Sequence, residues 1–421
     1  MEEKNEREEQ ALTKVEIERE PGEIVVGLDI GTTKICCVVG EVTENTTEII
    51  GVGIVPSQGL KKGIVVNIES TVNSIKQAVR QAEETAGCDL RSVEVFVGIA
   101  GNHIKGFNSP GILAINNREI KKVDIDEVIT AARTVKISEN QRVIHVIPQE
   151  YMVDDHTGIQ NPIGMTGVRL VTNVHIVTAD IGAVHNLVTC CNKAGLEVAD
   201  IVLESIASAN AVLSPDEMEL GVALVDIGGG TTDLAVFCDG TIRHTCEIGL
   251  GGHNLTNDLS VGLRTPLQEA ERLKEDFGGA IASIIKPNLV VDVPTVGDRD
   301  PRKVTQKVLV DILEARMIEI LEMVDRELVA SGQKNRINGG VVITGGTALL
   351  ANIVDLAEQI FDMPVRIGYP VGITGRVDEV YSPRCTTGVG LVMYGREKNK
   401  EGNRHEASVM NRMKGWIKKI M

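Results

Sequence analysis

The chain has 421 residues, of which 43% are hydrophobic, 24% charged and only 2% aromatic, and its formal net charge is −16. This length exceeds what one core usually supports, so we expect two or more domains. The negative charge argues against non-specific nucleic-acid binding, and the scarcity of aromatic rings argues against single-stranded nucleic-acid binding. The eight cysteines form no C-x-x-C pair and are expected to be buried, reduced thiols. We expect neither a signal peptide nor a membrane-spanning helix.

The first half of the chain predicts one α/β domain interrupted by a smaller module. Residues 1–22 are rich in Glu and lack periodicity, which predicts a disordered acidic tail of unassigned role. Apolar runs and helical spacing then assign 23–102 to the first part of the domain, 103–181 to an inserted small α+β module, and 182–215 to the second part. The predicted strands are 24–30, 35–40, 48–55, 93–99, 143–154, 168–178 and 197–203, and the predicted helices are 70–86, 123–135, 182–194 and one starting at 204.

The second half predicts another α/β domain over 216–378, with an outer subdomain at about 253–340. Helical patterns cover 252–276 and 303–330, and the second of these carries an apolar side of Val308, Ile312, Ala315, Ile318, Leu321 and Val324. A strand over 341–344 runs into a Gly-rich turn and a helix. Residues 379–395 are expected to return to the first domain, 396–407 to form a flexible linker, and 408–421 to form a separate helix.

Two segments far apart in the chain share one pattern. Each has an apolar strand, an Asp, an aliphatic residue, Gly, a Thr-Thr pair and a second apolar run. Gly at a hairpin tip lets backbone N–H groups approach phosphate oxygens, and Thr hydroxyls add donors. A carboxylate at the end of each strand suits hydrated Mg²⁺. The duplicate therefore predicts two phosphate-binding hairpins, whose residues are Asp29, Gly31, Thr32, Thr33 and Lys34, and Asp226, Gly228, Gly229, Gly230, Thr231, Thr232 and Asp233.

Three further candidates are weaker on pattern alone. Gly345, Gly346 and Thr347 follow a short strand and open a helix, where the backbone could pass close to an adenine or ribose, although Gly-Gly turns are common. Glu271 and Lys274 share a helix face, but they could equally form a solvated ion pair. Glu204 stands at a helix start, where a Glu often serves only the helix dipole.

The order of hairpin, connecting helix, hairpin, Gly-Gly turn and closing helix resembles the actin-like ATPase superfamily over roughly residues 24–395. The resemblance implies two similar α/β domains around a cleft that binds ATP with Mg²⁺. It also implies residue roles. Asp29 and Asp226 would hold the metal and its waters, Glu204 would orient the attacking water, and Glu271 with Lys274 would flank the ribose and adenine.

The last segment has the pattern of a helix that lies in a membrane interface. Its apolar residues recur at helical spacing, its four cations take the opposite face, and 409–421 contain no acidic residue. Docking on the protein's own body or in a partner's groove are the alternatives. The predicted membrane-binding residues are Val409, Met410, Arg412, Met413, Lys414, Trp416, Ile417, Lys418, Lys419 and Ile420.

An actin-like ATPase with an inserted module and a basic C-terminal helix resembles the FtsA family of bacterial cell division proteins. That resemblance implies a peripheral protein on the cytoplasmic side of the membrane at the division septum, with weak ATPase activity. It also implies self-association into filaments, binding of the FtsZ C-terminal peptide by the outer subdomain, attachment of the FtsZ ring to an anionic membrane surface, and recruitment of other division proteins. A pilus-assembly ATPase of the PilM type and a small-molecule kinase of the same superfamily are the alternatives.

Overall fold

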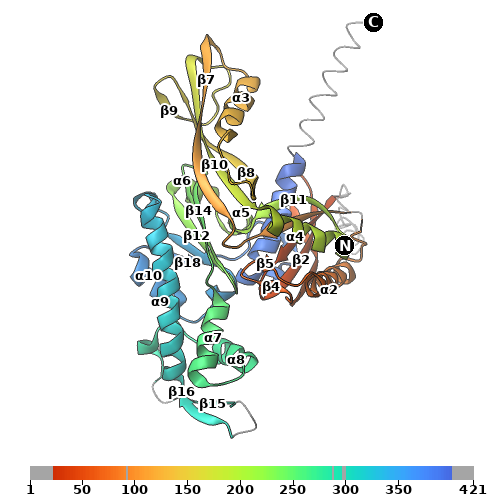
Figure 1. The fold of residues 1–421 in the computed structure, drawn as a ribbon, viewed down its shortest axis with the longest axis vertical. Coiled ribbons are helices and arrows are strands. Elements are labelled where there is room, and N and C mark those ends of the chain that lie inside the picture. The colour runs from red at the N-terminus through yellow and green to blue at the C-terminus, as the bar shows by residue number, and fades with distance from the viewer. Residues whose placement is uncertain (1–21, 92, 287–288, 296–299, 401–421) are drawn as a thin grey trace, which may run out of the picture.

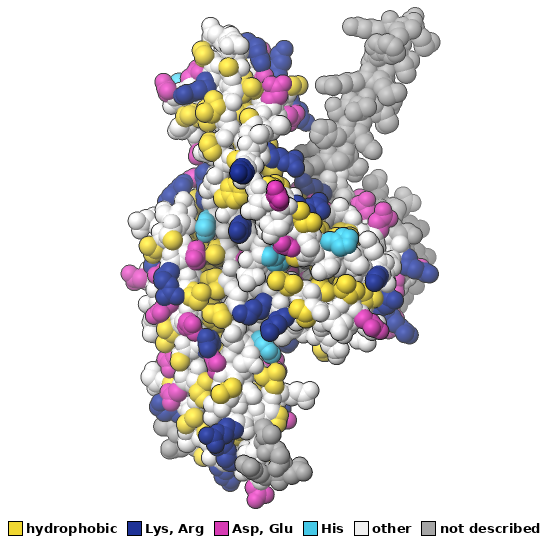
Figure 2. All heavy atoms as spheres, viewed as in Figure 1, with side chains coloured by type: hydrophobic (Ala, Val, Ile, Leu, Met, Phe, Trp, Pro, Cys, Tyr) yellow, Lys and Arg dark blue, Asp and Glu magenta, His cyan; other side chains and the backbone are white. Residues whose placement is uncertain are grey.

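The computed structural model describes residues 22–91, 93–286, 289–295 and 300–400. The predicted acidic tail, save Gly22, and the predicted membrane helix both lie outside these residues. Two α/β domains lie side by side, the inserted module stands at one end of the long axis, and the hairpin of β15 and β16 stands at the other (Figure 1). Across the face shown in Figure 2, acidic and basic side chains are mixed over the body.

The first domain is built on a six-stranded sheet in the order β11-β6-β1-β2-β3-β19. Side chains alternate across it, since Val26 and Leu28 face one buried layer and Val25 faces another. Helices α2 and α4 cover the first face, while α5 and the helical residues 386–400 cover the second. The strands are β1 (Glu23–Ile30), β2 (Lys34–Val42), β3 (Thr47–Pro56), β6 (Glu94–Ile99), β11 (Glu197–Leu203) and β19 (Thr374–Gly375), with a small hairpin of β4 (Leu60–Lys61) and β5 (Ile64–Val65).

The helices of the first domain begin and end as local sequence dictates. The helix α2 (Ile68–Ala86) starts where the Asn67 side chain accepts a hydrogen bond from the Ser70 N–H at 3.0 Å, and it ends at Gly87, which has a φ of 70°. The helix α4 (Ile181–Ala194) is capped by Asp180 and ends at Gly195 in the same left-handed conformation. The helix α5 (Glu204–Val212) follows β11 directly and carries small residues on its buried side.

The second domain holds a five-stranded sheet in the order β14-β13-β12-β17-β18. One large core joins this sheet to α7, α8, α9 and α10. The strands are β12 (Val222–Ile227), β13 (Thr232–Cys238), β14 (Thr241–Ile248), β17 (Val341–Thr344) and β18 (Val365–Ile367), with a separate hairpin of β15 (Val290–Val293) and β16 (Arg302–Thr305). The helices are α6 (Pro215–Leu220), α7 (Gly252–Leu263), α8 (Leu267–Phe277), α9 (Gln306–Ala330) and α10 (Ile353–Phe361), with 3-10 turns η2 (Ala282–Ile284), η3 (Lys334–Arg336), η4 (Gly346–Leu349) and η5 (Pro383–Cys385). The short helix α11 (Val377–Val380) follows β19 and lies against β3 of the first domain.

Several predicted elements differ from the structure in the second domain. The predicted helix 252–276 is two helices, because Arg264 is left-handed and Pro266 cannot occupy a helix interior. The helix α9 begins at Gln306 instead of 303, since the preceding residues pair as β16. The Gly-Gly turn opens the 3-10 turn η4, and the α-helix follows only at α10. Residues 396–400 continue the closing helix into the stretch predicted as a linker.

The inserted module is a four-stranded sheet in the order β7-β10-β8-β9 with one helix against it. Its elements are β7 (Lys105–Glu119), α3 (Lys122–Arg133), β8 (Gln141–Val153), β9 (His156–Ile159) and β10 (Thr166–Asp180). The strand β7 was not predicted, because Pro110 and Gly111 break its pattern. Proline is tolerated there because β7 lies at the edge of its sheet.

The inserted module contacts both domains. Toward the first domain, the Leu203 N–H donates to His145 Nε2 at 3.0 Å. Toward the second, the module's side chains reach the edge strand β14, where Gln149 Nε2 donates to the Ile242 carbonyl at 2.8 Å. The approach is close, since a Cβ added at Gly106 would lie 2.1 Å from Thr245 Oγ1. No helix of the described residues has the length and apolar character needed to cross a bilayer.

Candidate functional site

A cavity of about 480 Å³ lies between the two domains. Side chains and backbone from both predicted hairpins line it, together with the start of α5, the helices α7 and α8, and the turns η4 and η5. Glu204 and every predicted nucleotide-binding residue apart from Thr232 lie in its wall. The two motifs and the Gly-Gly turn, far apart in sequence, are therefore brought to one site.

The two hairpins have matching geometry. In the first, the Gly31 N–H donates to the Lys34 carbonyl at 3.0 Å, and in the second the Gly228 N–H donates to the Thr231 carbonyl at 3.0 Å. The tips pack against each other. A Cβ at Gly229 would lie 2.2 Å from Thr33 Oγ1, so this approach requires glycine.

Thr232 is the exception among the predicted site residues. It is the first residue of β13, fully buried, and its hydroxyl donates to the Leu250 carbonyl at 2.9 Å. Because side chains alternate along a strand, Thr231 and Asp233 face the cavity while Thr232 faces the core. Its role is to hold the strand to the loop before α7.

The carboxylates at the strand ends are buried and face the cavity. Asp29 forms an ion pair with Lys34. Burial alone would lower the pKa of Lys34, but the adjacent Asp29 raises it above its ordinary value. Asp226 accepts a hydrogen bond from Ser208 Oγ at 2.7 Å, and burial raises its pKa to about 6. Burial, followed by the charges of Asp29, Asp233 and Asp226, raises the pKa of Glu204 well above its usual range.

An acidic residue that was not predicted lies behind this layer. Glu247 on β14 stands directly opposite Asp233 on β13, and its carboxylate accepts a hydrogen bond from the Gly101 N–H at 3.4 Å. Burial raises the pKa of Glu247 to about 8. One oxygen each of Asp233 and Glu247 is buried without a hydrogen-bond partner among the described residues. The oxygen-rich donor set of Asp29 and Asp226, next to these orphaned oxygens, fits a hard cation such as Mg²⁺.

The loop before α7 was also missed as part of the site. The Gly252 N–H donates to the Gly228 carbonyl at 2.9 Å, and the His253 N–H donates to the Gly229 carbonyl at 2.7 Å. These bonds connect the tip of the second hairpin to the start of α7. The run of glycines at 249, 251 and 252 is the sequence signal that could have revealed it.

The far side of the cavity holds the remaining predicted residues. Lys274 lies 2.7 Å from Glu271 Oε1 and 3.0 Å from Thr256 Oγ1, and its side chain is only 14% exposed. The pair is thus partly buried in the wall instead of fully solvated. Gly345 has a φ of 86°, and a Cβ there would lie 2.4 Å from Asp226 Oδ1, so the turn requires glycine for two reasons.

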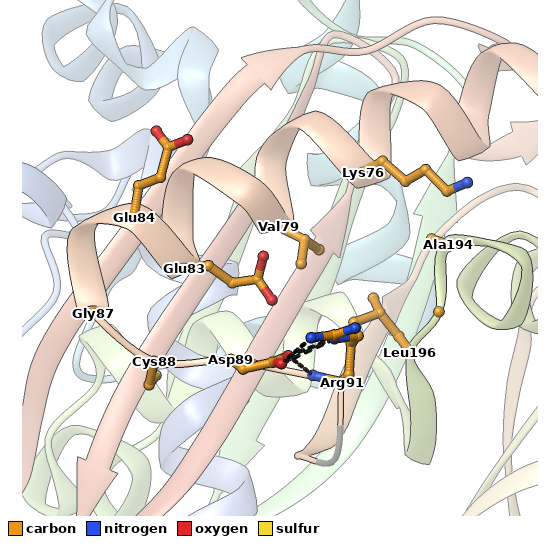
Figure 3. A pocket seen from close by; sticks show the side chains of 11 residues that line it. Lys76, Val79, Glu83, Glu84, Gly87, Cys88, Asp89, Arg91, Ala194 and Leu196 are labelled. Carbon is orange, nitrogen blue, oxygen red and sulfur yellow. Dashed lines mark hydrogen bonds and ion pairs between the residues drawn. The ribbon is translucent and has the colours of Figure 1, made fainter.

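A second hollow, of about 570 Å³, lies on the first domain near the C-terminal ends of α2 and α4 (Figure 3). The side chain of Arg91 donates to both oxygens of Asp89, and Glu83 accepts from the Leu90 N–H at 3.0 Å. None of the predicted site residues lines it. We assign it no ligand.

The fold and the paired hairpins define an actin-like protein. Among solved structures, the PilM-PilN type IV pilus biogenesis complex matches with a TM-score of 0.63 at 14% identity, covering 88% of this chain and 98% of that chain. MreB5 of Spiroplasma citri bound to ADP matches with a TM-score of 0.53 at 15% identity, covering 91% and 98%. At these identities the likeness concerns the fold alone.

Sequence relatives identify the family. Residues 101–178 match the family model of the SHS2 domain inserted in FtsA, and residues 223–390 match that of cell division protein FtsA. Cell division protein FtsA of Pseudomonas aeruginosa is 47% identical, covering 94% of this chain and 98% of its own length. The Escherichia coli K12 protein is 38% identical, covering 94% and 96%. The chain belongs to the FtsA family of cell division proteins.

Proposed function

We propose that this protein binds ATP with Mg²⁺ in the interdomain cavity, assembles into filaments, and attaches the FtsZ ring to the cytoplasmic face of the membrane. The observation that carries the proposal is the pair of facing hairpins in one cavity, in a chain of the FtsA family. The cavity volume lies within the range of small-molecule sites.

The residues divide the work at the nucleotide. Backbone N–H groups and Thr hydroxyls of both hairpins bind the phosphates, and Asp29 with Asp226 would hold the metal. The bound cation supplies charge neutralisation at the phosphates. Glu204 orients a water for attack from the cavity wall at the start of α5. We propose a weak ATPase whose main role is that of an adaptor.

Membrane attachment is assigned to the C-terminal segment. Its four cations contribute roughly 4 kcal/mol at an anionic surface. Partial burial of the apolar side adds several kcal/mol, and folding so short a helix costs part of it. One segment therefore binds weakly and reversibly, and a filament carrying many segments binds tightly.

The outer subdomain is the proposed site for the FtsZ C-terminal peptide. Apolar side chains are exposed on its elements, with Val261 on α7 at 78%, Leu267 on α8 at 42% and Val308 on α9 at 42% exposure. Such side chains suit a peptide with an apolar face. Self-association is assigned to the inserted module, and other division proteins are further partners. Neither the PilM-type function nor a small-molecule kinase is favoured by a feature of this chain.

The test is co-sedimentation with anionic liposomes, with and without ATP. Full-length protein should sediment, more steeply with protein concentration when ATP is present, and a chain ending at Lys400 should not. Trp416→Glu should abolish sedimentation, whereas the matched control Trp416→Phe keeps an aromatic anchor and should bind nearly as the wild type does. Equal binding by the wild type and Trp416→Glu would show that the segment is not a membrane anchor.

A further inference from the structure

The cations in the wall of the nucleotide cavity are not equivalent. Lys34 is paired with Asp29, and Lys274 is paired with Glu271. Arg384 is the third Lys or Arg in the wall, and within the described residues its guanidinium donates no hydrogen bond and forms no ion pair. The remaining charged wall is strongly acidic, so one unpaired arginine is conspicuous in it.

The backbone of Arg384 is held firmly beside the Gly-Gly turn. It lies in η5, whose Pro383 carbonyl accepts the Gly345 N–H at 3.1 Å. The Arg384 N–H itself donates to Ser382 Oγ at 3.3 Å. A Cβ added at Gly346 would lie 3.7 Å from Arg384 Cγ, so the side chain starts in contact distance of the turn. The backbone of Arg384 is therefore held in place, while the residue is exposed and its guanidinium is free to meet a ligand.

The cavity has two chemically different ends. The phosphate end holds the two hairpins with their N–H groups, hydroxyls and Lys34. The other end has an apolar wall from Leu349, Leu350 and Ala351, at and just after η4, with Leu350 near Gly278. The helix α8 adds the charged side chains of Glu271, Lys274, Glu275 and Asp276 to this end. Gly345 lies against Asp226 at the phosphate end, and the chain continues through Gly346 toward this apolar end. Arg384 is therefore on the side where a base would lie.

A base in this cavity lacks an aromatic partner. No Phe, Tyr or Trp belongs to the wall formed by the described residues, and the one imidazole in that wall belongs to His253, whose backbone N–H donates to the Gly229 carbonyl of the second hairpin. Arginine presents a flat guanidinium that stacks on an aromatic face, whereas lysine offers only a point charge.

We propose that Arg384 is a specificity-determining residue, whose guanidinium stacks on the base and favours a purine over a pyrimidine nucleoside triphosphate. A purine has a larger ring face than a pyrimidine, so stacking against the guanidinium stabilises its binding more. The inference rests on the proposed nucleotide binding and adds the residue that selects the base. It assigns no role to Arg384 at the phosphates.

The experiment measures the dissociation constants of ATP and CTP, each with Mg²⁺, for the wild type and three variants. Arg384→Ala should weaken ATP about tenfold and CTP less than threefold, so the ratio between them falls. Arg384→Lys keeps the positive charge but lacks the planar guanidinium, so its dissociation constants should resemble those of Arg384→Ala. Arg80→Ala, which removes an exposed arginine on α2 that is paired with Glu84, is the matched control and should change neither constant.

The outcomes separate this proposal from the one it rests on. If the wild type binds neither nucleotide at millimolar concentration, the nucleotide site itself is refuted, and Arg384 with it. If the wild type binds ATP but Arg384→Ala weakens ATP and CTP equally, or Arg384→Lys restores the wild-type ratio, the arginine acts by charge on the phosphates and base stacking is overturned. An unchanged ATP constant in Arg384→Ala also overturns it.

Discussion

His175 lies at the centre of the contact between the inserted module and the second domain. Its Nδ1 lies 2.7 Å from Asn108 Oδ1, and its Nε2 lies 2.9 Å from Thr245 Oγ1 on β14. Gln149 Nε2 also donates to Asn108 Oδ1, at 3.0 Å, and Asn108 Nδ2 donates to the Arg243 carbonyl at 3.0 Å. This pattern assigns a neutral ring that donates from Nδ1 and accepts at Nε2 from the threonine hydroxyl.

Replacing His175 by alanine should destabilise the protein by about 3 kcal/mol at pH 7. The side chain is 1% exposed, so its loss leaves a cavity and an unsatisfied hydroxyl on Thr245. An orphaned buried polar group costs about 1–3 kcal/mol, and incomplete collapse around the missing ring adds to it. Asn108 keeps its bond from Gln149 and adds little to the loss.

The loss should shrink as pH falls. Burial, followed by the nearby His244 and His145, lowers the pKa of His175 from 6.5 to about 4. The unfolded chain therefore binds more protons than the folded chain between these two values, and acidification favours unfolding through this window. At about 1.4 kcal/mol per pKa unit the full effect is about 3 kcal/mol, of which about 2 kcal/mol falls between pH 7 and pH 5.

Urea denaturation at pH 7 and pH 5 measures both quantities. The free energy of unfolding of the wild type should exceed that of His175→Ala by about 3 kcal/mol at pH 7 and by only about 1 kcal/mol at pH 5. Effects of Asp226 and Glu247 are present in both proteins and cancel from the difference. The matched control is His185→Ala, on an exposed position of α4, which should change stability little at either pH. A difference that is independent of pH would refute the assignment of a buried, neutral His175.

Three further outcomes follow from the cavity and its surroundings. ATP with Mg²⁺ should raise the melting temperature of the wild type, and Gly346→Asp should remove the shift, because its carboxylate would face the nucleotide and attract Arg384; thermal unfolding with and without millimolar ATP decides this. Glu204→Gln should slow hydrolysis at least tenfold while leaving ATP affinity within about threefold, and equal loss of both would indicate a structural role at the start of α5. An FtsZ C-terminal peptide should bind with a dissociation constant below hundreds of micromolar, and Val261→Asp on α7 should weaken it, which a fluorescence titration would show.

The local pattern of the chain was sufficient to predict the two hairpins. Each first strand is a continuous apolar run ended by Asp and Gly, and both faces of β1 and β12 are buried, as such runs favour. The helical spacing of apolar residues predicted a helix over 70–86, within two residues of the observed α2 (Ile68–Ala86). Where local chemistry fixes the backbone, the sequence is informative at the level of single residues.

Elements whose limits depend on tertiary packing were predicted less well. The predicted apolar side of α9 includes Val308, yet this residue is 42% exposed, while Leu309 and Leu313 are fully buried. The helix carries apolar residues around much of its circumference, so the contacts with α7, α8 and α10 decide which of them are covered. The spacing of apolar residues alone could not show which side of α9 is buried.

The site residues that were missed are those that only the fold brings near the motifs. Glu247 has no motif of its own, and it reaches Asp233 because the antiparallel register of β13 and β14 sets these two residues opposite each other. That register also places Thr245 two residues away on the same face of β14, where it meets His175 of the inserted module. A single strand thus carries one side chain toward the carboxylates behind the cavity and another into the inserted module. A displacement of β14 must alter both contacts. This edge strand therefore connects the inserted module to the carboxylates behind the cavity, and no local pattern in the sequence reveals that connection.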